Sequence, residues 1–349
     1  MLQKNIPSIV TLPVELIYHI LDNLDILTIF ISLRNVCTRL NNILDNYYRY
    51  KTFTILNLHR EKLNEQQFQC LFNALRNNKT ITELHLDCNR IDNQKTRYLV
   101  DALKNNTTIT ALVLCNNNIG IDGAQSLANL LNNNKTIERL NLGWNGIGSE
   151  GALHIADTLR NNHILTTLHL DINDINNQGT KYLADALHYN TTLKILILSN
   201  NNIDDTGALY LANMLNINKT LTKLVLCENK IDSTGVKYLA NALCNNKILT
   251  TLNLRLNKIN SIGAQYLANA LKNNQTLTDL YLGWNKIDNQ GAQYLANALD
   301  INHTLLSLHL ERNKIDCQGC EYFNNAILKN QSLIKLYITS NRINNQGMQ

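Results

Sequence analysis

The chain has 349 residues, a formal net charge of +5 and 17% charged residues. Its basic residues stand singly among acidic ones, so no basic stripe suits a phosphate backbone, and we expect no nucleic-acid partner. No apolar run reaches the roughly 18 residues that a membrane span needs, and the first residues lack the apolar core of a secretory signal. These features predict an intracellular protein of the cytoplasm or nucleus with no membrane partner.

Eight cysteines are spread along the chain, at positions 37, 70, 88, 115, 227, 244, 317 and 320. They do not recur at a shared repeat position, as cysteines that staple an extracellular repeat would, so reduced thiols are expected. Cys317 and Cys320 form a CxxC pair, but no second pair stands at zinc-finger spacing. The sequence therefore predicts no metal site and no bound cofactor.

Residues 8–48 come first and predict about three short helices. The first helix carries two adjacent apolar rows, one with Leu16, Ile20 and Leu24, the other with Ile17 and Leu21. Roughly forty residues are too few to bury so much Leu and Ile internally. The surplus apolar surface is expected to cover the end of the next domain or to bind another protein.

Residues 49–349 follow a 28-residue repeat in eleven units, without insertion or deletion, and the last unit is incomplete. Each unit is centred on a Leu-x-Leu pair, which starts at residues 56, 84, 112, 140, 168, 196, 224, 252, 280 and 308, with Leu336-x-Ile338 closing the series. This alternation predicts a short strand with one buried face. The spacing of Ala264, Leu267 and Leu271 predicts a helix after it.

Strand and helix repeated in register predict an α/β solenoid. Helices are wider than the strand spacing of about 4.8 Å, so the stack must bend with the sheet on its inside. The expected fold is a horseshoe with a parallel sheet on the concave side and helices on the convex side.

Positions that stay the same from unit to unit are expected to serve the stack. An Asn recurs from Asn89 to Asn341, with Glu61 in its place in the first unit, and a buried amide there can satisfy backbone groups of adjacent turns. A Gly follows six residues later from Gly123 onwards, with Lys95 in its place in the second unit. It indicates a permissive conformation or a close approach before the helix.

Asn-x-Thr and Asn-x-Ser sequences stand before the strand in most units, as at Asn78, Asn218 and Asn274. In a secreted protein they could accept glycans. Without a signal peptide, they are better explained by an Asn that ends each helix in a left-handed conformation and a Thr that opens the next strand.

Positions that vary on the concave face are expected to bind a partner. Trp144 and Trp284 occupy the same repeat position, which elsewhere holds Arg60, Asn200, Glu228 and Arg312. A position that accepts charge is not core, and exposed Trp with Tyr and Arg nearby is typical of an interface hot spot; alternatively, each Trp folds back over a loop. The predicted partner-binding residues are Val113, Arg139, Trp144, Ile195, Ile197, Val225, Arg255, Tyr281, Trp284 and Tyr337.

Histidine and carboxylate residues recur on these strands as three pairs, His85 with Asp87, His169 with Asp171, and His309 with Glu311. The pairs lie three and five units apart, which keeps them at least about 14 Å from each other, so they cannot form one catalytic centre. No nucleophile holds a fixed place beside them, and no Gly-rich phosphate loop exists. The prediction is a binding protein without catalytic residues.

The N-terminal helices resemble an F-box, through Leu12, Pro13, Glu15, Leu16, Ile20, Leu21, Leu24, Ser32, Leu33, Arg34, Val36, Cys37, Arg39 and Leu40. The LxxLxLxxNxI units from about residue 53 resemble leucine-rich repeats of the ribonuclease-inhibitor type. Together these resemblances imply a substrate receptor of an SCF (Skp, cullin, F-box) ubiquitin ligase, whose F-box docks on the Skp adaptor and whose repeats bind a target protein. The implied adaptor contacts are Leu12, Pro13, Leu16, Ile20, Leu21, Val36, Cys37 and Leu40.

Other functions stay open at this point. The N-terminal helices could be a plain cap over the first repeat, and the chain a binding or inhibitory scaffold without a ubiquitin role. A GTPase-activating module is a further alternative, for which Arg60 and Arg90 are the loop candidates. Finally, the chain stops at Gln349 before a helix covers Leu336 and Ile338, which predicts truncation, a frayed last unit or self-association.

Overall fold

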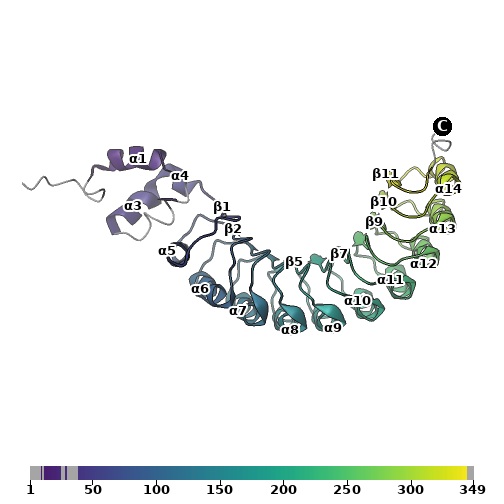
Figure 1. Cartoon of the computed structure of the whole chain (residues 1–349), viewed down its shortest axis with the longest axis horizontal. Coiled ribbons are helices and arrows are strands. Elements are labelled where there is room, and N and C mark those ends of the chain that lie inside the picture. Colours follow the sequence, from purple (N-terminus) through teal and green to yellow (C-terminus); the bar gives the residue numbers. More distant parts are fainter. Residues whose placement is uncertain (1–8, 10–11, 25–27, 30–37, 344–349) are drawn as a thin grey trace, which may run out of the picture.

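The structure is a computed structural model that describes residues 9, 12–24, 28–29 and 38–343. A group of helices stands at the N-terminal end and a curved solenoid follows it (Figure 1). The N-terminal helices within the described ranges are α1 (Val14–Asp22), α3 (Thr38–Asn46) and α4 (Tyr48–Lys51). No helix of these ranges is long and apolar enough to cross a bilayer.

The solenoid alternates strands and helices along residues 55–343. Its strands, all within the described ranges, are β1 (Ile55–Asn57), β2 (Glu83–His85), β3 (Ala111–Val113), β4 (Arg139–Asn141), β5 (Thr167–His169), β6 (Ile195–Ile197), β7 (Lys223–Val225), β8 (Thr251–Asn253), β9 (Asp279–Tyr281), β10 (Ser307–His309) and β11 (Lys335–Tyr337). The helices between them are α5 (Glu65–Arg76), α6 (Asn93–Leu103), α7 (Gly120–Asn133), α8 (Gly148–Leu159), α9 (Asn176–Leu187), α10 (Asp205–Ile217), α11 (Ser233–Asn245), α12 (Ser261–Leu271), α13 (Asn289–Leu299) and α14 (Cys317–Ile327).

The strands form one parallel sheet in chain order from β1 to β11. Each strand pairs with the next at a register shift of one unit, so that Leu56 faces Leu84 and Leu308 faces Leu336. The sheet lines the inside of the arc and the helices lie outside it (Figure 1). The predicted α/β horseshoe is confirmed.

The N-terminal helices share a core with the first unit. Leu21 and Leu44 belong to the same cluster of buried side chains as Leu56 of β1. Tyr47 is also buried, and its hydroxyl donates a hydrogen bond to Asp22 at 2.7 Å. The helices therefore pack on the solenoid end.

The recurring Asn after each strand forms the expected ladder. In the sixth unit, Asn201 is fully buried, and its amide nitrogen donates to the carbonyls of Leu170 (2.8 Å) and Ser199 (3.1 Å). Its amide oxygen accepts from the backbone N–H groups of Asn173 (3.0 Å) and Ile175 (3.2 Å). One side chain thus satisfies backbone groups of two units, as buried polar groups require.

A second Asn ladder replaces the predicted left-handed helix caps, and that prediction is wrong. Asn218 has φ −62° and ψ 133°, an extended conformation, and is 3% exposed. Its amide nitrogen donates to Leu187 and Asn190 carbonyls of the preceding unit, and its oxygen accepts from the N–H groups of Thr220 and Leu221. The extended backbone lets one amide bridge two units, which a surface cap cannot do.

The recurring Gly before each helix marks a close approach. A Cβ on Gly123 would stand 2.4 Å from Cγ2 of Ile119, and one on Gly151 would stand 2.8 Å from Cβ of Ile147. Neither glycine has a positive φ. Tight packing at the start of the helix, and no special conformation, therefore explains this position.

The last strand is less covered than the others. Leu336 and Ile338 are half-buried, whereas Leu308 and Leu310 of the preceding unit are buried. This agrees with the expected lack of cover on those two residues. Fraying and self-association stay predictions, and residues 344–349 lie outside the described part of the chain.

Candidate functional site

The first candidate surface lies on α1. Pro13 precedes this helix, and its carbonyl accepts the N–H of Ile17 at 3.1 Å. The side chain of Leu16 is 49% exposed. Pro13 is also exposed, and Leu12 and Ile20 are half-buried. These four predicted contacts therefore offer an apolar surface.

Two other predicted contacts are corrected. Leu21 and Leu40 are 0% and 1% exposed, so in this conformation they hold the helices together and offer no surface to a partner. The sequence could not separate the two apolar rows, since both carry Leu and Ile. Val36 and Cys37 lie outside the described residues.

The second candidate surface begins at a backbone feature of the solenoid. The fourth residue after the first Leu of each pair has a positive φ, between 50° and 61°, in all eleven units: Arg60, Cys88, Asn116, Trp144, Ile172, Asn200, Glu228, Leu256, Trp284, Arg312 and Ser340. A left-handed conformation costs an L-residue roughly 1–2 kcal/mol. Glycine would remove that cost, yet no unit uses it here, which favours a role for the side chains.

Hydrogen bonds to the next unit hold this conformation. The N–H groups of Trp144 and Trp284 each donate to the carbonyl of the following unit at 2.7 Å, those of Asp171 and Glu311. The parallel ladder thus continues past the end of the strand and fixes the left-handed turn. No glycine marks this position in the sequence, so the left-handed turn could not be predicted from it.

Both tryptophans are exposed, as predicted. Trp144 is 56% exposed and Trp284 is 37% exposed. Two guanidinium groups stack on the Trp284 ring, with Arg312 at 4.2 Å and Arg255 at 5.4 Å from its centre. Cation–π contacts of this kind are worth about 0.5–1 kcal/mol at exposed sites.

Three rings stack beside this tryptophan on β9, β10 and β11. The His309 ring lies 4.1 Å from Tyr281 and 4.3 Å from Tyr337, with interplanar angles of 19° and 16°. Tyr281 and Tyr337 were predicted from sequence, while His309 had been considered only as a partner of Glu311, which it meets at 3.9 Å. Burial lowers the pKa of His309 despite the neighbouring carboxylates, so the stacked ring is neutral at pH 7.

The predicted apolar residues line two hollows of the concave face. Val113, Arg139 and Ile195 line one of about 320 Å³. Ile197, Val225 and Tyr281 line another of about 450 Å³. Trp144 lines neither of them. The structure therefore gathers most of the predicted residues in three places, the two hollows and the surroundings of Trp284.

Arg139 crosses the first hollow to a carboxylate two units away. Its guanidinium donates to Glu83 at 2.5 Å, and His85 lies 3.4 Å from the same carboxylate. Burial acts to raise the pKa of Glu83, but the hydrogen bonds from Arg139 and His85 outweigh it and lower that pKa. The Glu83 carboxylate in the wall of this hollow is therefore ionised and paired with Arg139 and His85.

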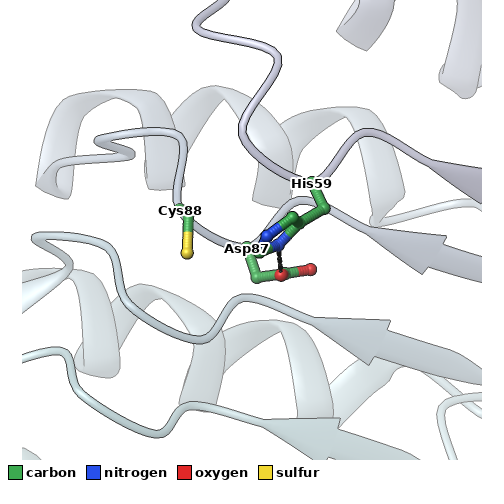
Figure 2. A group of neighbouring side chains, drawn as sticks. All are labelled: His59, Asp87 and Cys88. Carbon is green, nitrogen blue, oxygen red and sulfur yellow. Dashed lines mark hydrogen bonds and ion pairs between the residues drawn. The ribbon is translucent and has the colours of Figure 1, made fainter.

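One predicted His–carboxylate pair is wrong. His85 meets Glu83, and Asp87 is paired with His59 of the preceding unit (Figure 2). Ligand atoms of His59, Asp87 and Cys88 lie within 4.8 Å of one another. Because residues 28 apart lie side by side, aligning the units would have placed His59 beside Asp87.

The comparisons with known proteins agree with this architecture. A Leucine Rich repeat model matches residues 77–94, 105–128, 133–156, 189–212, 218–240, 245–268, 273–296, 302–323 and 329–349, more than half of the chain. An F-box domain model matches residues 9–52, close to the predicted 8–48. Neither model describes a catalytic domain.

Two solved structures are similar to parts or most of the chain. One is the leiomodin-1 actin-binding site 2, 35% identical over 30% of this chain and 61% of that one, with a TM-score of 0.29. The other is an internalin (inlF) from Listeria monocytogenes, 19% identical over 87% of this chain and 84% of that one, with a TM-score of 0.47. No curated protein matches the chain.

Proposed function

Because the chain belongs to the leucine-rich-repeat family and carries an F-box domain at its N-terminus, we propose that it is the substrate receptor of an SCF-type ubiquitin ligase. The F-box domain binds the Skp adaptor and, through it, the cullin scaffold. The concave face of the repeats binds a target protein. The chain itself contributes binding and no chemistry.

The apolar surface on α1 is the observation that carries this proposal. Leu16 is 49% exposed, while Ile17 and Leu21 of the same helix are fully buried. A plain cap needs only the buried row. The exposed row, with Pro13 beside it, supports docking on an apolar partner surface.

The junction between the two parts supports the same function. Buried side chains of both parts belong to one cluster. Within the N-terminal helices, Arg49 of α4, the helix that leads into β1, donates to the carbonyl of Asp22 at 3.0 Å and so holds the end of α1. A receptor must hold its target at a set position relative to the adaptor. A packed junction supplies that geometry better than a flexible linker does.

Binding of the purified full chain to the Skp adaptor tests the proposal. We expect Leu16→Asp combined with Ile20→Asp to weaken this binding at least about 100-fold, because two charges would enter an apolar interface. Ile301→Asp is the matched control, since Ile301 is 56% exposed at the far end of the solenoid. It should bind like the wild type.

Absence of adaptor binding, or equal binding by all variants, would refute the proposal. A binding or inhibitory scaffold would show that result together with a tight partner on the concave face. A GTPase activator would instead stimulate GTP hydrolysis and lose this effect on Arg60→Ala or Arg90→Ala.

A further inference from the structure

We propose that His59, Asp87 and Cys88 form a binding site for Zn²⁺ at the edge of the concave face. The site shares no residue with the exposed surface of α1, the two hollows or the groups around Trp284, and it goes beyond the proposed ligase function. It also departs from the sequence-based expectation of a chain without metal.

The repeat geometry brings the three residues together. Asn57 of β1 pairs with His85 of β2, and the chain then runs two residues further in each unit, to His59 and Asp87. The His59 ring contacts the Asp87 carboxylate, and the Cys88 thiol is on the next residue (Figure 2). The ligand atoms of all three lie within 4.8 Å of one another, close enough for one ion to reach each of them.

The donor set suits zinc. Zn²⁺ binds imidazole nitrogen, carboxylate oxygen and thiolate sulfur, commonly in a tetrahedron. A neutral His59, an ionised Asp87 and a Cys88 thiolate carry two negative charges, which balance the ion. Binding releases the thiol proton of Cys88 to solvent as the Zn–S bond forms.

The surroundings of Cys88 suit a metal ligand. The side-chain amide of Asn116 in the third unit donates to Sγ of Cys88 at 3.2 Å. A metal-bound thiolate accepts such an outer hydrogen bond, which orients the ligand. Cys88 is held at φ 61° by a hydrogen bond from its N–H to the carbonyl of Cys115 at 3.0 Å.

The fourth coordination position is open. Cys115 occupies the same repeat position as His59 and Asp87, and Cys227 occupies it four units further on. The expectation that no two cysteines share a repeat position is therefore wrong. Cys115 does not belong to the group within 4.8 Å. Since the side chain of His59 is 46% exposed, water or a side chain of a bound protein can complete the tetrahedron.

Basic side chains nearby discriminate between metal ions. Arg60, Lys62, Arg90 and Lys95 line a hollow of about 340 Å³ together with Cys88. Their positive charge opposes every divalent cation, so Mg²⁺ and Ca²⁺, which rely on charge and oxygen ligands, gain too little here to bind. A thiolate ligand favours the softer Zn²⁺.

Cobalt and zinc titrations of the metal-free full chain test the site. Co²⁺ is the spectroscopic probe, because a thiolate ligand gives a charge-transfer absorption, and Zn²⁺ competition then gives the zinc affinity. We expect one equivalent of Co²⁺ to produce this absorption and Cys88→Ser to abolish it. His59→Asn should weaken zinc binding by more than about 100-fold, beyond the 10–100-fold cost of an outer-shell change.

Cys227→Ser is the matched control, since Cys227 is a half-buried free thiol at the repeat position of Asp87, far from the site. It should bind like the wild type. Circular dichroism with chelator present shows whether each variant folds. If Cys88→Ser does not fold, His59→Asn still tests the site, because the His59 side chain is exposed and its replacement should leave the fold intact. The proposal is overturned if the wild type gives no thiolate absorption, if Cys227→Ser removes it, or if His59→Asn leaves the zinc affinity unchanged.

Discussion

The loops Gly143–Trp144 and Gly283–Trp284 share a local sequence and a backbone but not their surroundings. The tryptophans have φ values of 54° and 57°. In each loop a Cβ on the glycine would collide with a carboxylate of the next unit, Asp171 at 2.7 Å or Glu311 at 2.4 Å. The repeat thus builds the same scaffold twice, five units apart.

The neighbouring units make the two rings different. Arg255 and Arg312 flank Trp284, whereas the equivalent positions around Trp144 hold Cys115 and Ile172. Among the residues that the structure describes, no cationic group stacks on Trp144. The repeat therefore decides where a tryptophan stands, and the variable residues beside it decide what the ring can bind.

The largest expected effect tests whether the two scaffolds are equal. Asn145→Ala and Asn285→Ala should each reduce the free energy of unfolding by about 3 kcal/mol, because each leaves buried backbone groups unpaired. The lost bonds include those to the carbonyls of Leu114 (2.9 Å) and Leu254 (3.0 Å). Urea unfolding followed by circular dichroism measures both. A loss under about 1 kcal/mol in either variant would contradict the ladder's role.

The next effect separates the two rings. Trp144→Gly should raise the free energy of unfolding by about 1 kcal/mol, because glycine adopts a positive φ without strain. Trp284→Gly should change the free energy of unfolding little, because the loss of two cation–π contacts offsets the same relief of backbone strain. Thermal unfolding of both variants checks this difference. Equal gains would mean that Arg255 and Arg312 add no stability.

A smaller effect concerns the histidines next to the two loops, His169 and His309. Burial lowers the pKa of both side chains, so the unfolded chain binds more protons below about pH 6.5. Stability is then fully present above about pH 6.5 and is lost as pH falls towards the lowered pKa. His309→Gln and His169→Gln should each remove less than about 1 kcal/mol of this acid sensitivity.

Unfolding by urea at about pH 7.5 and about pH 5.5 measures the sensitivity of wild type and variants. A wild type that gains stability on acidification would contradict the sign of both pKa shifts. A change confined to His309→Gln would show that the Tyr281–His309–Tyr337 stack, which His169 lacks, dominates.

The smallest effect is spectroscopic. Trp144 and Trp284 are the two tryptophans of the chain, so Trp284→Phe and Trp144→Phe leave one emitter each. Acrylamide should quench Trp144 more than Trp284, since their exposed fractions are 56% and 37%. Equal quenching would indicate that the arginines do not cover Trp284 in solution.

Much of the fold follows from the period of the sequence repeat alone. A strict 28-residue repeat predicts the strand register, the sheet order and the Asn201-type ladder, because every unit must satisfy its neighbour in the same way. The exposed tryptophans were also predictable, from a repeat position that accepts charge. These are properties that one unit shares with all the others.

Only the tertiary structure decided the features that depend on the particular residues of neighbouring units or on how the helices pack. It buried Leu21 and Leu40, gave Asn218 an extended backbone, and paired Asp87 with His59 in place of His85. The two apolar rows of α1 are alike in composition, and only the packing of the helices distinguishes them. The sequence by itself therefore determined the horseshoe and its exposed tryptophans, while only the structure decided which side chains meet across units, since those contacts depend on residues that the repeat does not fix.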